Sequence, residues 1–275
     1  MADATPQTTG ESAPPRPRLL PRLVGNLQRQ NWTEVVIELV IVVLGVFLGL
    51  QATKWAADEA DRKRGRDYLE RLAVDLRADM NARQTVVTYF AAVEDSARRA
   101  DALLAEADPD PTALVVNAYR ATEQNFNPQQ RATWDELVAA GHIGLLPRRV
   151  IEAGVGEYYS FDWAREIMMS MEASPYRRRV RSLLPHRVQN AIRERCGDRR
   201  DEMGRIPGFR EDCQLGLSAG EIEAAAAVLK ADPGVAYDLR YQFSTLATAR
   251  FNLGGDVAFL RHVIAAVPEP KGDRR

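Results

Sequence analysis

The strongest constraint on this chain is one apolar segment near its amino terminus, Val35 to Leu50, which lies between Trp32 and Trp55. Apolar runs of this kind are typical of helices that cross a lipid bilayer. At about 1.5 Å of rise per residue, the two tryptophans are roughly 34 Å apart along a helix, close to the thickness of a hydrocarbon core with the edges of its headgroups. The sequence therefore predicts a transmembrane helix over residues 32–55, with both tryptophans as interface anchors.

Two other interpretations of this segment fit less well. The strictly apolar part, Leu39 to Leu50, has only twelve residues and would also suit a buried core helix. The flanks favour a membrane, because Glu38 is the only ionisable residue from Val35 to Thr53. A cleavable signal peptide has an apolar region close behind a basic start, whereas here a long polar stretch comes first and no Ala-x-Ala-like site follows. We therefore expect a retained anchor.

The composition leaves room for this anchor and one soluble domain of about 200 residues. The chain has 275 residues, of which 45% are hydrophobic and 27% charged, with a net charge of −1. A DNA-binding domain normally shows a marked basic excess, so we expect no nucleic-acid partner. Five of the fifteen prolines fall in residues 1–30, which predicts a disordered tail there.

The segments after the anchor read as helical. Apolar residues recur at spacings of three and four along Leu69, Leu72, Ala73, Leu76 and Met80, and the first proline after the anchor is Pro109. Further helices are expected over 112–124, 129–140, 147–172, 175–196, 218–231, 235–252 and 255–266. No runs alternate with period two. The sequence predicts an all-α protein in which the transmembrane helix continues into a long helix and an irregular helical-bundle soluble domain.

This interpretation divides the chain into five parts. They are a disordered Pro-rich tail (1–30), the transmembrane helix (32–55), a long juxtamembrane helix (56–107), a helical soluble domain (108–267) and a disordered carboxyl-terminal tail (268–275). The long helix ends at Asp108-Pro-Asp-Pro111, because proline cannot donate the helical hydrogen bond. Ser218 and Glu221 have the spacing of a capping box at the start of a later helix.

Small residues share one face of the transmembrane helix with two acids. At about 100° per residue from Glu38, the glycines lie within roughly 20° of it and the alanines within roughly 40°. Gly45-x-x-x-Gly49 has the spacing that lets two helix backbones approach closely in lipid. We therefore predict a transmembrane association seam, formed by Glu34, Glu38, Gly45, Gly49, Ala52 and Ala56. The alternative is that these glycines only reflect how common glycine is in membrane helices.

Glu38 is costly inside a bilayer, by about 2.5–3.5 kcal/mol at the centre and less near an edge. It lies under two turns from Trp32, so its carboxyl could reach the headgroups. A carboxyl that hydrogen-bonds across a helix pair is the other hypothesis, because Glu38 lies on the predicted seam. Proton or ion conduction is a third, less favoured because one span with one acid offers no relay.

These residues resemble the start of a widespread family of uncharacterised bacterial single-pass membrane proteins. The resemblance rests on the spacing Glu38-x6-Gly45-x5-Gln51-x3-Trp55, followed by a charged helix, and on two later patterns, Asp135 to Gly141 and Glu157-Tyr-Tyr159. It covers residues 32–160. This chain departs from the family where Ile37 replaces the usual glycine and where the tail is rich in proline. The resemblance implies the topology of a bacterial inner-membrane protein and no activity.

The orientation of the span is predicted from charge and from the cysteines. Four arginines precede the span and six basic residues follow it within about twenty residues, which by count favours an exported amino terminus. The amino termini of the resembled family are usually internal, and long carboxyl-terminal domains translocate largely regardless of charge. Cys196 and Cys213, the only cysteines, could close a polar loop by a disulfide. On balance we expect a periplasmic soluble domain.

No short motif points to an enzyme. The sequence has no phosphate loop, nucleophile elbow or metal-ligand spacing among His142, His186 and His262, so we assign no catalytic, cofactor-binding or metal-binding residue and expect no cofactor. A basic stretch from Tyr176 to Arg195 is interpreted as a solvated helix face rather than a lipid-headgroup site. Aromatic residues between Trp134 and Trp163 are interpreted as core rather than as a ligand pocket.

Three functional hypotheses remain. The leading one is a membrane-anchored helical scaffold or sensor-like interaction module that self-associates through its transmembrane helix. The second is an accessory subunit of a larger membrane complex, which would dock a foreign span on the Glu38 face. The third is a membrane-bound enzyme whose site is assembled from dispersed side chains. The expected partners are the lipid bilayer and either a second copy of the chain or another membrane protein.

Overall fold

The computed structural model describes residues 32–268 and divides the chain into two units, Met1–Ala60 and Asp61–Arg275. In the first unit, the described residues form the start of helix α2, which spans Trp32–Ala105. The predicted tails, 1–30 and 268–275, lie outside the described residues except for Pro268.

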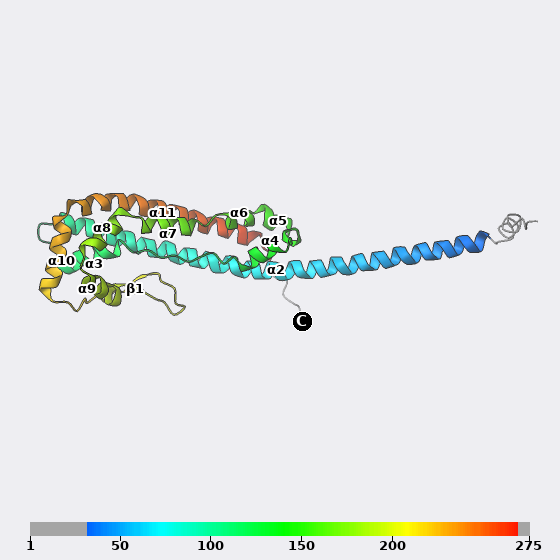
Figure 1. The fold of residues 1–275 in the computed structure, drawn as a ribbon, viewed down its shortest axis with the longest axis horizontal. Helices are drawn as coiled ribbons and strands as arrows, with labels where there is room; N and C mark the ends of the chain where they lie inside the picture. The colour runs from blue at the N-terminus through cyan, green and yellow to red at the C-terminus, as the bar shows by residue number, and fades with distance from the viewer. Residues whose placement is uncertain (1–31, 269–275) are drawn as a thin grey trace, which may run out of the picture. The chain divides into compact units, whose positions relative to one another are not determined.

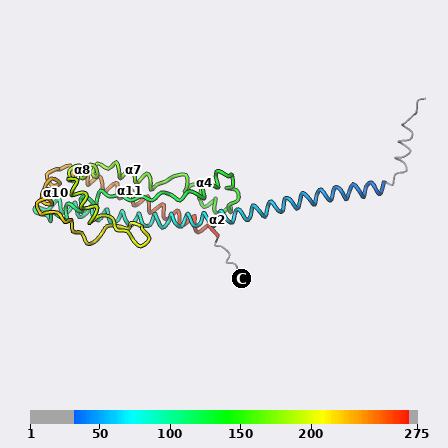
Figure 2. Tube along the Cα trace, turned by 60° about the horizontal axis from the view of Figure 1, so that its bottom comes forward, coloured from blue at the N-terminus to red at the C-terminus, as the bar shows by residue number. Residues whose placement is uncertain are grey.

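The second unit is helical, as the sequence predicts, and its helices pack on the carboxyl-terminal part of α2 (Figure 1). Both views show α11 lying alongside α7 (Figure 2). The elements after α2 are α3 (Pro111–Arg120), α4 (Ala132–Ala139), the 3-10 turn η1 (Ile143–Leu145), α5 (Arg148–Glu152), α6 (Val155–Ser160), α7 (Trp163–Glu172), α8 (Pro175–Leu183), α9 (His186–Ala191), the π-helical turn η2 (Ile192–Cys196), α10 (Ala219–Ala231) and α11 (Pro233–Ala266).

Several helix ends follow the local sequence signals. The carboxylate of Asp110 accepts hydrogen bonds from the backbone N–H groups of Thr112 and Ala113, at 2.8 and 3.2 Å, and Pro111 occupies the first turn of α3. The predicted capping box is confirmed, because the Ser218 hydroxyl accepts from the Glu221 N–H at 3.4 Å and the Glu221 carboxylate accepts from the Ser218 N–H at 3.1 Å. These groups satisfy amides that have no partner inside the helix.

Two predicted helices are shorter than expected. Residues 147–172 form three helices instead of one. The chain turns first at Gly154, whose φ of +90° places it in the left-handed region, and again at Phe161, whose backbone is extended. Residues 175–196 divide at Leu184, since Pro185 disfavours the helical conformation of the residue before it. Apolar periodicity carries no signal for any of these breaks.

The expected boundary between the last two helices is also wrong. The stretches 235–252 and 255–266 form one helix, α11, that runs through Gly254 and Gly255. Glycine weakens a helix by about 1 kcal/mol without ending it, and the buried side chains of Leu253 and Val257 hold this stretch in place. The described residues also include a short antiparallel pair of strands, β1 (Asp198–Arg199) and β2 (Gly208–Phe209), which the sequence analysis did not expect.

The core of the second unit consists of two apolar clusters separated by polar residues. On α2 the first cluster ends at Leu76 and the second begins at Val86, and on α11 the boundary lies between Leu260 and Leu253. The polar groups between them, which we call the polar layer, are the side chains of Asp79, Arg83, Asp162 and Asp256 and the hydroxyl of Tyr158, whose ring belongs to the first cluster.

Candidate functional site

The residues of the predicted association seam lie on α2 and are all exposed in the described chain. A Cβ atom built on Gly45 or Gly49 meets no heavy atom within 4 Å, so the surface beside both glycines is open. The Thr53 hydroxyl donates to the Gly49 carbonyl oxygen at 2.9 Å, so this hydroxyl has a hydrogen-bond partner within its own helix. The seam residues are Glu34, Glu38, Gly45, Gly49, Ala52 and Ala56.

The apolar segment of α2 leaves its large side chains uncovered. Within residues 32–268, one helix is long and apolar enough to cross a membrane, and none of its most apolar stretch is buried. Trp32 and Trp55 at its two ends are 64% and 69% exposed. Soluble monomers rarely expose a continuous apolar surface as large as this one. The surface is therefore expected to be covered by lipid or by another protein.

Cys196 and Cys213 form a disulfide. The loop that it closes contains the β1–β2 pair, and Arg120 on α3 holds this loop from inside the helical unit. The guanidinium of Arg120 donates to the carbonyl oxygen of Cys196 at 2.7 and 2.9 Å and to that of Arg210 at 2.7 Å, and it lies 5.0 Å from the ring centroid of Phe209. The loop is therefore tied to the helices by one covalent link and by the half-buried guanidinium of Arg120.

The basic stretch after Tyr176 is largely neutralised by acidic partners. Arg181 lies 2.9 Å from the Glu123 carboxylate, and Arg179 bridges Asp232 and Asp238 at 3.2 and 2.6 Å. Arg187 pairs with Glu221 at 3.1 Å. These pairs favour the solvated-face interpretation over a headgroup-binding cluster.

The polar layer is the feature that sequence patterns did not reveal. Arg83 is 1% exposed and donates from Nε to Asp256 Oδ2 at 3.0 Å and from Nη2 to Asp162 Oδ1 at 3.2 Å. Asp79 is also 1% exposed and accepts from the Tyr158 hydroxyl at 2.8 Å. Burial raises the pKa of both Asp79 and Asp256, although Arg83 opposes the shift.

The aromatic residues that the sequence analysis assigned to the core divide into two groups. Trp134 stacks on Tyr159 with ring centroids 5.2 Å apart, and both rings are buried, as expected for core residues. Phe161 and Trp163 are 46% and 44% exposed, so for these two the core interpretation is wrong. Their rings contact each other edge to face at a centroid distance of 4.6 Å.

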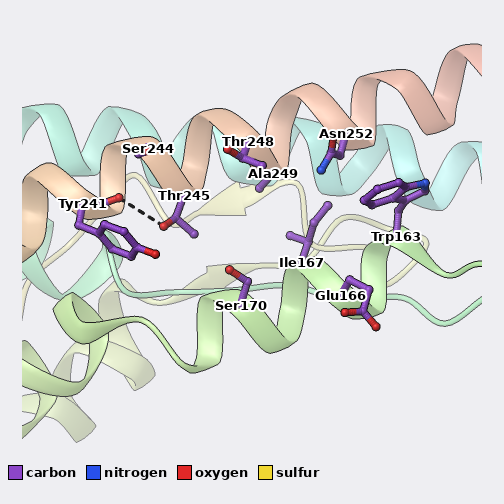
Figure 3. A pocket seen from close by; sticks show the side chains of 10 residues that line it. All are labelled: Trp163, Glu166, Ile167, Ser170, Tyr241, Ser244, Thr245, Thr248, Ala249 and Asn252. Carbon is purple, nitrogen blue, oxygen red and sulfur yellow. Dashed lines mark hydrogen bonds between the residues drawn. The ribbon is translucent and has the colours of Figure 1, made fainter.

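Trp163 borders two hollows, one between α7 and α11 and one between α6 and α11. The first, of about 270 Å³, lies between Trp163 and Tyr241 (Figure 3). Its walls carry hydroxyl groups from both helices, with Ser170 on α7 facing Thr245 and Thr248 on α11.

The second hollow, of about 440 Å³, adjoins the first at Trp163 and Asn252. We call it the aromatic groove. Five aromatic residues and two carboxylates line it together with Gly255. The aromatic residues are Tyr158, Phe161, Trp163, Phe251 and Phe259, and the carboxylates are those of Glu157 and Asp256.

Comparison with protein-family models, characterised proteins and solved structures finds no match to this chain. The fold and the uncovered helix define its class by themselves: an all-α protein that has, within residues 32–268, one helix long and apolar enough to span a membrane.

Proposed function

We propose that this protein is a single-span membrane protein whose helical domain acts as an interaction module, a scaffold or sensor held at the bilayer surface. The observation that carries the proposal is the uncovered apolar stretch of α2 between Trp32 and Trp55, because a lipid bilayer is the solvent that suits its length and its aromatic ends. We assign this membrane as the inner membrane of a bacterium, and this assignment rests on the family resemblance alone.

Membrane insertion is tested by fractionation of cells that express the full chain. The protein is expected to sediment with membranes and to remain there after a carbonate wash, since a spanning helix is held by burial of its whole apolar surface. A double variant that places charge in the span, Val42→Arg with Leu44→Arg, is expected to lose this behaviour. Wild-type protein in the carbonate supernatant would contradict the proposal.

We further propose that two copies associate through the seam of Glu34, Glu38, Gly45, Gly49, Ala52 and Ala56. The open space beside both glycines supports close backbone approach, and dispersion contacts drive helix pairing in lipid. In a membrane-association reporter, Gly45→Ile with Gly49→Ile is expected to abolish pairing. Phe47→Ile is the matched control, because Phe47 lies on the opposite face of the helix. Equal pairing of the wild type and both variants would contradict a role of the seam in self-association.

In the alternative hypothesis, the protein is an accessory subunit whose seam binds the transmembrane helix of a different protein. Crosslinking in native membranes followed by mass spectrometry separates the two. Links between copies of this chain support self-association, whereas a reproducible link from the seam to another protein supports the subunit. Glu38→Gln separates a hydrogen-bonding role from a charge role, because the amide keeps the hydrogen-bonding capacity and loses the charge.

A periplasmic location of the helical domain is supported by the disulfide, since such bonds persist in oxidising compartments. It is tested by an impermeant thiol reagent on spheroplasts of a variant that carries one added cysteine at exposed Met203. Labelling without lysis is expected. Labelling only after lysis would place the domain in the cytoplasm.

A further inference from the structure

The aromatic groove combines apolar walls with a surplus of negative charge. Phe251 is 82% exposed, and Phe161 and Trp163 expose nearly half of their surface, which is uncommon for residues of this size in a soluble domain. Three of the ring-bearing residues, Phe161, Trp163 and Phe251, therefore present uncovered ring surface beside a hollow of about 440 Å³.

The charge comes from the polar layer behind the groove. The guanidinium of Arg83 donates to both Asp162 and Asp256 and also attracts the Asp79 carboxylate, so one cation serves three acidic groups. Asp256 both belongs to this layer and lines the groove, where it is 8% exposed. Only its Oδ2 accepts a hydrogen bond from the described residues, which leaves Oδ1 for a ligand.

A second carboxylate lies at the rim. Glu157 lines the groove and is exposed, and no basic residue is among those that line it. A cation near the rings would therefore meet two carboxylates and no repelling charge from the lining.

We propose that the aromatic groove binds a small organic cation that carries an alkylammonium group. Ammonium groups are attracted to the faces of aromatic rings by the ring quadrupole, and this attraction is strongest where water is excluded. Carboxylates beside the rings add Coulombic attraction and select against anions and neutral isosteres. This site lies wholly within Asp61–Arg275 and does not depend on the proposed membrane anchor.

Two glycines give the groove its shape. A Cβ atom built on Gly154 would lie 2.8 Å from Cζ of Phe259 and 3.5 Å from Oε2 of Glu157, so this glycine lets both side chains reach the groove. Gly255 forms part of the lining, and a Cβ atom built there meets nothing within 4 Å. A larger side chain at Gly255 would thus enter the hollow without displacing the protein.

The proposal is tested by titrating the full-length protein, in dodecyl maltoside, with choline and with its neutral isostere 3,3-dimethylbutan-1-ol. Calorimetry is expected to show saturable choline binding at micromolar to millimolar concentrations, and about tenfold weaker binding of the isostere because the cation–π and Coulombic attractions are lost. Equal binding of both compounds, or no saturable choline binding in the millimolar range, would overturn the proposal.

Matched variants locate the binding. Gly255→Leu is expected to remove choline binding by filling the groove, whereas Gly254→Leu, on the neighbouring residue outside the lining, is expected to keep it. Both changes raise helix propensity, so both variants should fold. Phe251→Ala and Glu157→Gln remove exposed side chains and are each expected to weaken binding by about fivefold. Unchanged binding in Gly255→Leu would show that choline binds elsewhere.

Discussion

Arg83 on α2 and Asp256 on α11 are 173 residues apart in the sequence, yet Nε of the first donates to Oδ2 of the second at 3.0 Å. Both side chains are almost fully buried. The pair lies between the two apolar clusters and joins the long helix to the last one. It therefore fixes the register of α11 against α2, because a shift of either helix would leave a buried charge without its partner.

Arg83→Met is expected to destabilise the protein by about 3–5 kcal/mol, since it leaves buried carboxylates without their cation. The free energy of unfolding, measured by urea denaturation with circular dichroism, tests this. Arg148→Met is the control, because Arg148 pairs with Glu152 at 90% and 59% side-chain exposure and its loss should cost about 0.5 kcal/mol or less. Equal effects of the two changes would contradict a register role for Arg83.

The sequence predicts the apolar parts of this fold well and the polar layer not at all. Leu72, Ala73 and Leu76 recur at helical spacing and are buried, because burial of a continuous apolar stripe stabilises a helix whatever it packs against. Asp79 and Arg83 fall on the same face of the helix. Asp256 compensates the buried charge of Arg83, and the Tyr158 hydroxyl and the Gln130 N–H donate to the buried carboxylate of Asp79. No local sequence pattern encodes these contacts.

The aromatic groove could not be predicted from the sequence for a related reason. Phe161 and Trp163 are apolar residues within a helical pattern, which predicts burial. The break at Gly154 and the short α6 shift the following turn, so that both rings face the groove. The disulfide is easier to predict, because two cysteines allow only one intramolecular pairing.

Reduction of the disulfide is expected to lower the free energy of unfolding by about 3 kcal/mol, because the bond joins two cysteines that are 17 positions apart and so restricts the unfolded chain. Urea denaturation with and without a phosphine reductant measures the effect. The double variant Cys196→Ala, Cys213→Ser should match the reduced wild type and show no response to reductant. A reductant effect that persists in this variant would have another origin.

Acid is expected to weaken the contact between α2 and α11 at Glu94. Burial alone would raise the pKa of Glu94, but hydrogen bonds from Arg250 and Arg98 together lower it below the ordinary value of 4.5. A depressed carboxyl pKa contributes stability that is present above the ordinary value and is lost as the pH falls through the folded-state pKa.

Glu94→Gln should therefore be less stable than wild type at pH values above 4.5, and the difference should shrink as the pH falls below it. Urea denaturation over a series of pH values measures this difference. Glu70→Gln, on an exposed residue of the same helix with no ion pair among the described residues, should show no such convergence. A constant gap between Glu94→Gln and wild type would refute the linkage.

Alanine should have opposite effects at two glycines of the groove region. Gly154 has a φ of +90°, and a Cβ there would approach Phe259 to 2.8 Å, so Gly154→Ala should destabilise the protein by about 1–3 kcal/mol. Gly254 lies inside α11 with open space around it, so Gly254→Ala should stabilise by about 0.5–1 kcal/mol through helix propensity. Thermal unfolding of both variants measures the signs. Destabilisation by Gly254→Ala would mean that α11 is not a continuous helix at this point, because only a bend or a close neighbour would make glycine necessary there.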